Sequence, residues 1–141
     1  MKDRFNKLFF LLGMLLSGYL AQAQEPFSQC TAAFLNKKMV VDEYSPTGKC
    51  SLPQNATGTL TVCTADLSPE RSVPLEKIRF KIALKKQQAN TLIMFSEMTY
   101  KEVNIEKVLT QCQPGDNIVL MTLDNRYSLP HHEILVLENG Q

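Results

Sequence analysis

The chain has 141 residues, of which 44% are hydrophobic, and its 15 lysines and arginines nearly balance its 14 aspartates and glutamates. This balance excludes an electrostatic case for nucleic acid as a partner, because such binding depends on many contacts between basic side chains and phosphates. The length is sufficient for one ordinary domain with a hydrophobic core.

The first 23 residues have the three parts of a secretory signal peptide. A basic start (MKDRFNK) is followed by an apolar run from Leu8 to Leu20, and Ala21-Gln22-Ala23 is a small-x-small cleavage site. The run is shorter than the roughly 20 residues that a membrane-spanning helix needs, which makes an uncleaved anchor the weaker alternative. We therefore expect cleavage before Gln24, export to the periplasm or to the outside of the cell, and no membrane span after cleavage.

Residues 24–141 are then expected to form a single domain with 12 basic and 13 acidic residues, a formal charge of −1. Its first predicted strand is 36–44, followed by a Ser-Pro-Thr-Gly turn in which proline presets φ and glycine accepts a positive φ. A short strand at 49–52, a second turn at 53–58 and an alternating strand at 59–64 come next.

All four cysteines lie in the predicted domain: Cys30, Cys50, Cys63 and Cys112. An even number of cysteines in an exported protein predicts two disulfides, and no CxxC spacing indicates a zinc or redox motif. The hairpin formed around the second turn would place Cys50 opposite Cys63, with their Cβ atoms near bonding range. Cys30 would then bond Cys112. Three pairings are open, and free buried thiols are the alternative.

The clearest strand is 77–85, in which apolar and basic residues alternate as expected for an antiparallel sheet with one wet face. Its apolar face consists of Ile78, Phe80, Ile82 and Leu84. The other face is a basic stripe of Lys77, Arg79, Lys81 and Lys85. A solvated face, or an edge guarded by charge against aggregation, is the simpler interpretation of the stripe. The functional interpretation is binding of an acidic partner, an anionic glycan or lipid headgroups.

A strand at 91–96 precedes the one helical pattern of the chain. Residues 104–112 contain an apolar stripe with spacing i, i+3, i+4, i+7, which predicts a short helix. Asn104 is suited to cap its first turn, and Pro114-Gly115 ends it. Strands at 117–123, 126–129 and 133–137 complete the domain.

His131, His132 and Glu133 form the histidine cluster of the chain. A catalytic zinc site needs three converging protein ligands, whereas adjacent residues in an extended segment point to opposite faces. We therefore interpret the cluster as a polar start to the last strand and predict no metal, cofactor or catalytic residue. A weak metal site on His131 is the alternative.

Short strands with turns every 8–12 residues predict a mainly β fold. We expect an antiparallel β-sandwich of immunoglobulin-like architecture, with about seven or eight strands and one short helix near 104–112.

The C-terminal half resembles the C-terminal periplasmic β-domain of the gliding-motility and type IX secretion protein GldM. The resemblance extends over residues 75–137 and is carried by LEKIRF (75–80), KVL (107–109), PGDNI (114–118), YSLP (127–130) and ILV (134–136). It implies a non-catalytic β-domain for protein contact in a Bacteroidetes-type envelope.

The sequence thus predicts an exported, non-catalytic domain that binds another protein of the envelope or extracellular space, for which strand addition to a sheet edge is one route. A secreted inhibitor or a glycan-binding module is the alternative. A small metal-dependent enzyme using His131 is the third hypothesis.

Overall fold

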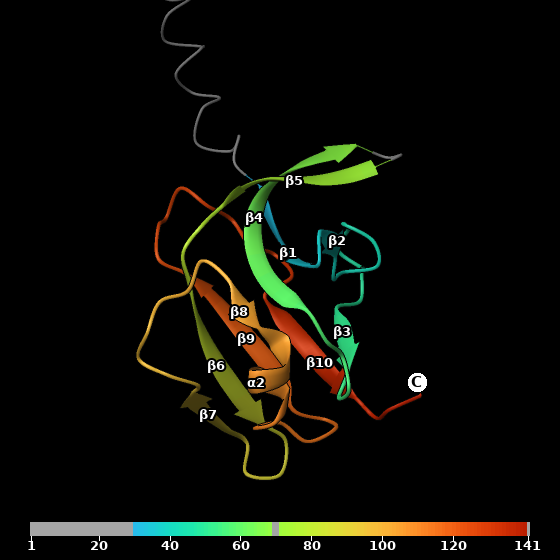
Figure 1. Ribbon diagram of the computed structural model, residues 1–141, viewed down its shortest axis with the longest axis vertical. Coiled ribbons are helices and arrows are strands. Elements are labelled where there is room, and N and C mark those ends of the chain that lie inside the picture. The colour runs from blue at the N-terminus through green and yellow to red at the C-terminus, as the bar shows by residue number, and fades with distance from the viewer. Residues whose placement is uncertain (1–29, 69–70, 141) are drawn as a thin grey trace, which may run out of the picture.

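The computed structural model describes residues 30–68 and 71–140, so the predicted signal peptide of residues 1–23 lies outside the described residues. These residues form ten strands and one short helix, arranged in two five-stranded sheets that pack against each other (Figure 1). The predicted mainly β sandwich with a single short helix is therefore confirmed. No helix in the described ranges is long and apolar enough to cross a membrane.

The first sheet has the strand order β2-β1-β4-β5, with β8 pairing to β4, and all of its pairs are antiparallel. Its strands are β1 (Thr31–Leu35), β2 (Lys38–Met39), β4 (Thr59–Ser68), β5 (Arg71–Lys77) and β8 (Val103–Asn104). The predicted strand at 36–44 is reduced to the two residues of β2, because Asn36 and Lys37 turn the chain with positive φ angles of 51° and 71°.

The second sheet has the order β3-β10-β9-β6-β7. Its strands are β3 (Ser51–Pro53), β6 (Phe80–Lys86), β7 (Thr91–Met94), β9 (Asn117–Thr122) and β10 (Glu133–Leu137). β3 runs parallel to β10, which corrects the expectation of a wholly antiparallel sandwich. The predicted strand at 126–129 is not formed, because Asp124–Tyr127 makes a turn and only Ser128 bridges to Cys30.

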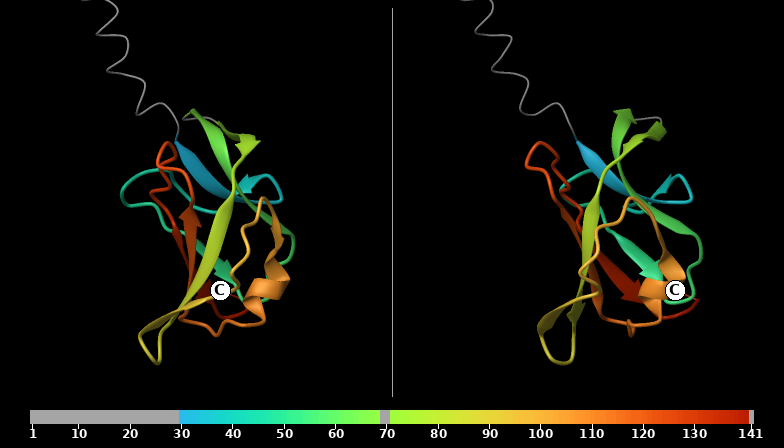
Figure 2. Two further views of the ribbon diagram at one scale, coloured as in Figure 1. Left: turned by 90° about the vertical axis from the view of Figure 1, so that its left-hand side faces the viewer. Right: turned by 60° about the vertical axis from the view of Figure 1, so that its left-hand side comes forward.

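The predicted strand 77–85 is divided between the two sheets. Ile78 donates its N–H to Val62 of β4, whereas Phe80 lies opposite Thr122 of β9. The chain therefore passes from one sheet to the other at Ile78 and Arg79, and Figure 2 shows β5 continuing into β6 along the side of the molecule. The predicted apolar face is confirmed, since its four members are buried: Ile78, Phe80, Ile82 and Leu84.

The main core lies between the sheets and receives side chains from both of them and from α2 (Ile105–Leu109). Ile105, Val108 and Leu109 of α2 are buried, and the side chain of Asn104 accepts a hydrogen bond from the N–H of Glu106 at 3.0 Å, as the capping pattern predicts. A smaller cluster of Ala32, Phe34 and Cys63 lies on the opposite face of β1 and β4, with Met39 and Tyr44 packed against it.

The predicted pairing of Cys50 with Cys63 is wrong. Cys50 directly precedes β3 in the second sheet and bridges to Val41, whereas Cys63 lies in β4 of the first sheet, opposite Ala32. The segment between them connects two sheets instead of two neighbouring strands. All four cysteines, which belong to the described residues, have free thiols, so the bridge between Cys30 and Cys112 that followed from the first pairing is also not formed.

Asp116 is a buried carboxylate at the turn between α2 and β9, with 4% of its surface exposed. It accepts hydrogen bonds from the backbone N–H of Gln113 (2.9 Å) and of Gln87 (3.0 Å) and from the ammonium of Lys86 (3.1 Å). Burial of this carboxyl disfavours its charged form, but the two N–H groups and the Lys86 ammonium outweigh burial and lower the pKa of Asp116 below its ordinary value of 3.8.

The neighbours of Asp116 extend this set of contacts. Lys86 also donates to the carbonyl of Gln111 at the end of the helical segment. The backbone of this turn forms two hydrogen bonds with Val136 of β10. The N–H of Gly115 donates to the carbonyl of Val136 (2.8 Å), and the N–H of Val136 donates to the carbonyl of Asp116 (2.9 Å). One turn thereby joins the β6–β7 hairpin, the segment after α2, β9 and β10.

We predict that Asp116→Asn lowers the free energy of unfolding by about 2–3 kcal/mol at neutral pH, because it removes a charged acceptor from three donors. The carboxylate contributes fully to the free energy of unfolding at pH values above its pKa in the unfolded chain. This contribution is lost as the pH falls through the lower pKa that Asp116 has in the folded protein. Urea unfolding at a series of pH values should therefore show the gap between the two proteins narrowing below about pH 4. Asp124→Asn, which removes a surface carboxylate paired with Arg126, is the control and should have a much smaller effect. A gap that stays constant down to pH 3 would contradict this role for Asp116.

Candidate functional site

The three residues of the histidine cluster do not converge. The Nε2 atom of His131 lies 2.7 Å from the carbonyl oxygen of Ser45, so Nε2 carries the proton and donates. His132 and Glu133 are exposed, and a carboxylate oxygen of Glu133 lies 3.9 Å from the ammonium of Lys85. Within residues 30–68 and 71–140, no group of three His, Cys, Asp or Glu side chains is placed to hold a metal ion.

His131 instead anchors a loop. Its ring packs edge-on against Tyr44, with 5.2 Å between ring centroids, and its Nδ1 atom is buried without a hydrogen-bond partner among the described residues. Tyr44 donates to the carbonyl of Thr31 at 3.2 Å. Burial, followed by the proximity of Cys30, raises the pKa of Tyr44 to about 12, so the phenol stays a neutral donor. These contacts hold the segment between β2 and β3 against the start of β1 and the approach to β10.

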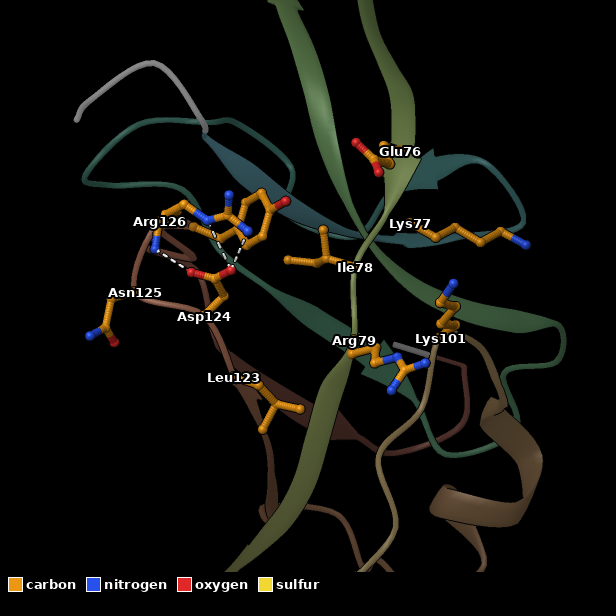
Figure 3. A pocket seen from close by; sticks show the side chains of 10 residues that line it. Glu76, Lys77, Ile78, Arg79, Lys101, Leu123, Asp124, Asn125 and Arg126 are labelled. Carbon is orange, nitrogen blue, oxygen red and sulfur yellow. Dashed lines mark hydrogen bonds and ion pairs between the residues drawn. The ribbon is translucent and has the colours of Figure 1, made fainter. Parts of the chain in front are cut away.

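The basic stripe is divided by the passage of the chain between the sheets. Lys77 and Arg79 line a groove beside this passage (Figure 3). Lys101 and Arg126, which the sequence did not indicate as site residues, line it as well. Lys81 and Lys85 lie on β6, beyond that groove. The pattern of one strand could not reveal Lys101 and Arg126, because they come from distant loops that the fold brings alongside.

An exposed apolar edge is the second surface feature, and it is formed by β7. Thr91, Leu92, Ile93 and Met94 are all exposed, with Leu92 at 60%, Ile93 at 52% and Met94 at 44%. β7 is the last strand of its sheet, so only β6 pairs with it. Met98, at 65% exposed, follows shortly after. We call Leu92, Ile93 and Met94 the β7 edge.

The backbone of the β7 edge has a defined orientation. Phe95 donates its N–H to Ile82 of β6, and backbone groups in an antiparallel pair alternate in direction along the strand. Ile93 therefore faces β6, whereas the N–H and carbonyl groups of Leu92 and Met94 point to solvent. The side chains alternate too, so Leu92 and Met94 lie on the outer face of the sheet and Ile93 lies on the inner side.

The sequence predicts a strand at 91–96 but not its position at the edge of a sheet. The signal was present in part, because Leu92, Ile93 and Met94 lack the polar–apolar alternation of a strand with one wet face. Such a run is typical of a strand buried on both faces. The structure leaves this one uncovered, which makes it a candidate interaction surface.

Comparison of the chain with protein-family models, with curated proteins and with solved structures finds no match in any of the three.

We predict that the four thiols differ in their reactivity toward iodoacetamide in the folded protein. Burial, with Asp42 adding to it, raises the pKa of Cys50 to about 12, and burial raises the pKa of Cys112 to about 11. Because the thiolate is the nucleophile, both should react slowly at neutral pH, whereas the exposed Cys30 should react first. Mass spectrometry of tryptic peptides after timed labelling measures this order. Labelling of Cys112 as fast as Cys30 under native conditions would contradict the structure, and labelling after denaturation serves as the control.

Proposed function

We propose that this chain is an exported, non-catalytic β-sandwich domain that binds another protein of the cell envelope or extracellular space. The observation that carries the proposal is the β7 edge, where three consecutive apolar side chains and unpaired main-chain groups lie at the end of a sheet. An extended segment of the partner would add to this edge as a sixth strand.

Strand addition would pair the free main-chain groups of the β7 edge and cover its exposed apolar side chains. The outward N–H and carbonyl groups of Leu92 and Met94 would pair with the backbone of the added segment. Its side chains would cover Leu92 and Met94 on the outer face and Ile93 on the inner side. Full burial of an exposed side chain of this size contributes about 1.5–3 kcal/mol. Because each of the three is already about half covered, burying the remainder supplies roughly 2–4 kcal/mol in total toward the cost of association.

Two further observations support the non-catalytic part of the proposal. The Nε2 atom of His131 is occupied by a loop carbonyl, which gives this residue a structural role. The raised pKa values of Cys50 and Cys112 keep these thiols in the protonated form, which is a poor nucleophile.

The proposed cellular location and the proposed class of partner are supported by the sequence alone. The signal-peptide pattern of residues 1–23 supports export. The resemblance of residues 75–137 to the periplasmic β-domain of GldM supports protein contact in a Bacteroidetes-type envelope as the setting.

A photo-crosslinking amino acid at Thr91 tests the proposal in the cells that produce the protein. Thr91 is exposed in β7, whereas Thr57, also exposed, follows β3 at the other end of the sheet and provides the matched control position. We expect one defined protein to be crosslinked from position 91 and not from position 57. Equal crosslinking from both positions, or a different set of proteins in each repeat, would contradict docking at β7.

The double substitution Leu92→Lys and Met94→Lys should then weaken binding of that protein by about tenfold or more. Each substitution places a charge where the proposed complex is apolar, and about 1.4 kcal/mol in total already corresponds to tenfold. Both side chains are exposed in the protein alone, so the midpoint of thermal unfolding should change little. Unchanged affinity in a folded double variant, measured by surface plasmon resonance, would rule out the β7 edge as the binding surface.

A further inference from the structure

The groove beside the passage between the sheets has a volume of about 660 Å³. Its two sides flank the segment from Glu76 to Arg79, as Figure 3 shows. Lys77, Arg79 and Lys101 lie on one side, and the turn from Leu123 to Tyr127 lies on the other. The groove is separate from the β7 edge, because none of its lining residues belongs to β7.

The groove exists because β9 ends before it reaches β5. Phe80 of β6 lies opposite Thr122, the last residue of β9. One residue further, the chain leaves the sheet at Leu123 and turns, with the N–H of Tyr127 donating to the carbonyl of Asp124 at 3.2 Å. The position next to β5 that a longer β9 would fill is therefore open.

This opening exposes main-chain groups of the β5 edge. The N–H of Ile78 donates to Val62 of β4, so the backbone groups of the adjacent Lys77 and Arg79 point away from β4. They face the side on which β9 continues the second sheet. Within the described chain, no backbone hydrogen bond joins Arg79 to the departing Leu123. The groove therefore offers donors and acceptors in the spacing of an extended chain.

Cations outnumber carboxylates among the residues that line the groove: Lys77, Arg79, Lys101 and Arg126 against Glu76 and Asp124. Lys77 is paired with Glu102 at 2.9 Å, and Arg126 is paired with Asp124 at 2.7 Å, with its guanidinium 5.8 Å from the centre of the Tyr127 ring.

The other two cations of the groove lack such partners. Arg79 and Lys101 have no acidic partner among residues 30–68 and 71–140, and both line the groove. An anionic ligand in the groove would supply the opposite charge that these two cations lack.

We infer that the groove binds an extended polypeptide segment carrying carboxylates, with the main chain of the segment along the β5 edge and its carboxylates attracted to Arg79 and Lys101. The free backbone groups and the 51% exposed side chain of Leu123 suit a polypeptide. A sugar ring would need an aromatic platform, but Tyr127, the aromatic residue that lines the groove, is in contact with Arg126. The inference goes beyond the proposed function, since it assigns a second binding surface that does not depend on β7.

Selection of random octapeptides displayed on phage against the immobilised protein tests this assignment. We expect the selected peptides to contain more aspartate and glutamate than the starting library. Binding of the most enriched peptide, measured by fluorescence anisotropy, should weaken with added salt, because the attraction between exposed charges is screened. A selection without acidic enrichment would overturn the inference.

Two double variants with the same change in net charge locate the site. Arg79→Glu with Lys101→Glu should weaken peptide binding by about tenfold or more, since close charge pairs across an interface contribute 1.5 kcal/mol or above. Lys81→Glu with Lys85→Glu, on the strand beyond the groove, should leave the affinity within about twofold. All four positions are at least partly exposed, and the milder pair Arg79→Gln with Lys101→Gln repeats the test if the reversed charges disturb folding.

Three results would overturn the assignment. Equal losses in the two glutamate variants would show that only net charge matters. Loss of peptide binding in the double variant Leu92→Lys with Met94→Lys would place the peptide on β7 instead. If that variant still binds the peptide and the variant of Arg79 and Lys101 does not, the groove and the β7 edge are separate binding surfaces. Binding of heparin through Arg79 and Lys101 without binding of any acidic peptide would identify an anionic glycan as the ligand.

Discussion

The carboxylate of Asp116 is the interaction on which the second sheet most depends. It is nearly fully buried, and it receives two backbone N–H groups and the Lys86 ammonium. A buried charge is costly unless donors surround it, and here the donors come from the β6–β7 hairpin and from the segment after α2. The same turn exchanges two hydrogen bonds with Val136 of β10. The position of β7 is thus set from its base, because Lys86 ends β6 and Gln87 begins the turn that leads to β7.

Both surfaces that we assign to binding arise where the two sheets are left open. β7 ends the second sheet with apolar side chains on both of its faces. The groove lies where β9 stops at Thr122 and β5 continues alone into the first sheet. Natural sheets usually guard such edges with charge, short length or a covering loop. Among the described residues, the β7 edge has neither a charged side chain nor a covering segment. The groove, in contrast, is flanked by basic residues.

Patterns within one strand or one helix turn could be predicted from the sequence. The alternation of residues 77–85 correctly identified Ile78, Phe80, Ile82 and Leu84 as buried, and the spacing of residues 104–112 identified α2 and its cap at Asn104. These features depend on neighbours a few residues away. The division of residues 77–85 between two sheets could not be predicted in this way, because alternation continues unbroken through the passage at Ile78 and Arg79.

Features that depend on distant partners were missed or predicted wrongly. The pairing of Cys50 with Cys63 assumed that strands adjacent in sequence are adjacent in space, but β3 pairs with β10, more than 80 positions later in the chain. β1 was missed because TAAFL lacks alternation, and its two faces are covered by the main core and by the smaller cluster around Phe34. The groove brings together Arg79, Lys101 and Arg126 from three segments, and no local pattern relates them.

Hydrogen exchange of single amides, followed by nuclear magnetic resonance, tests the β7 edge most directly. In the protein alone, the amides of Leu92 and Met94 should exchange rapidly and the amide of Ile93 slowly, because only Ile93 bonds to β6. Binding of the crosslinked partner should strongly slow the exchange of the Leu92 and Met94 amides and leave the exchange rates of amides in the other strands unchanged. Rapid exchange of Leu92 and Met94 in the fully formed complex would contradict strand addition at β7.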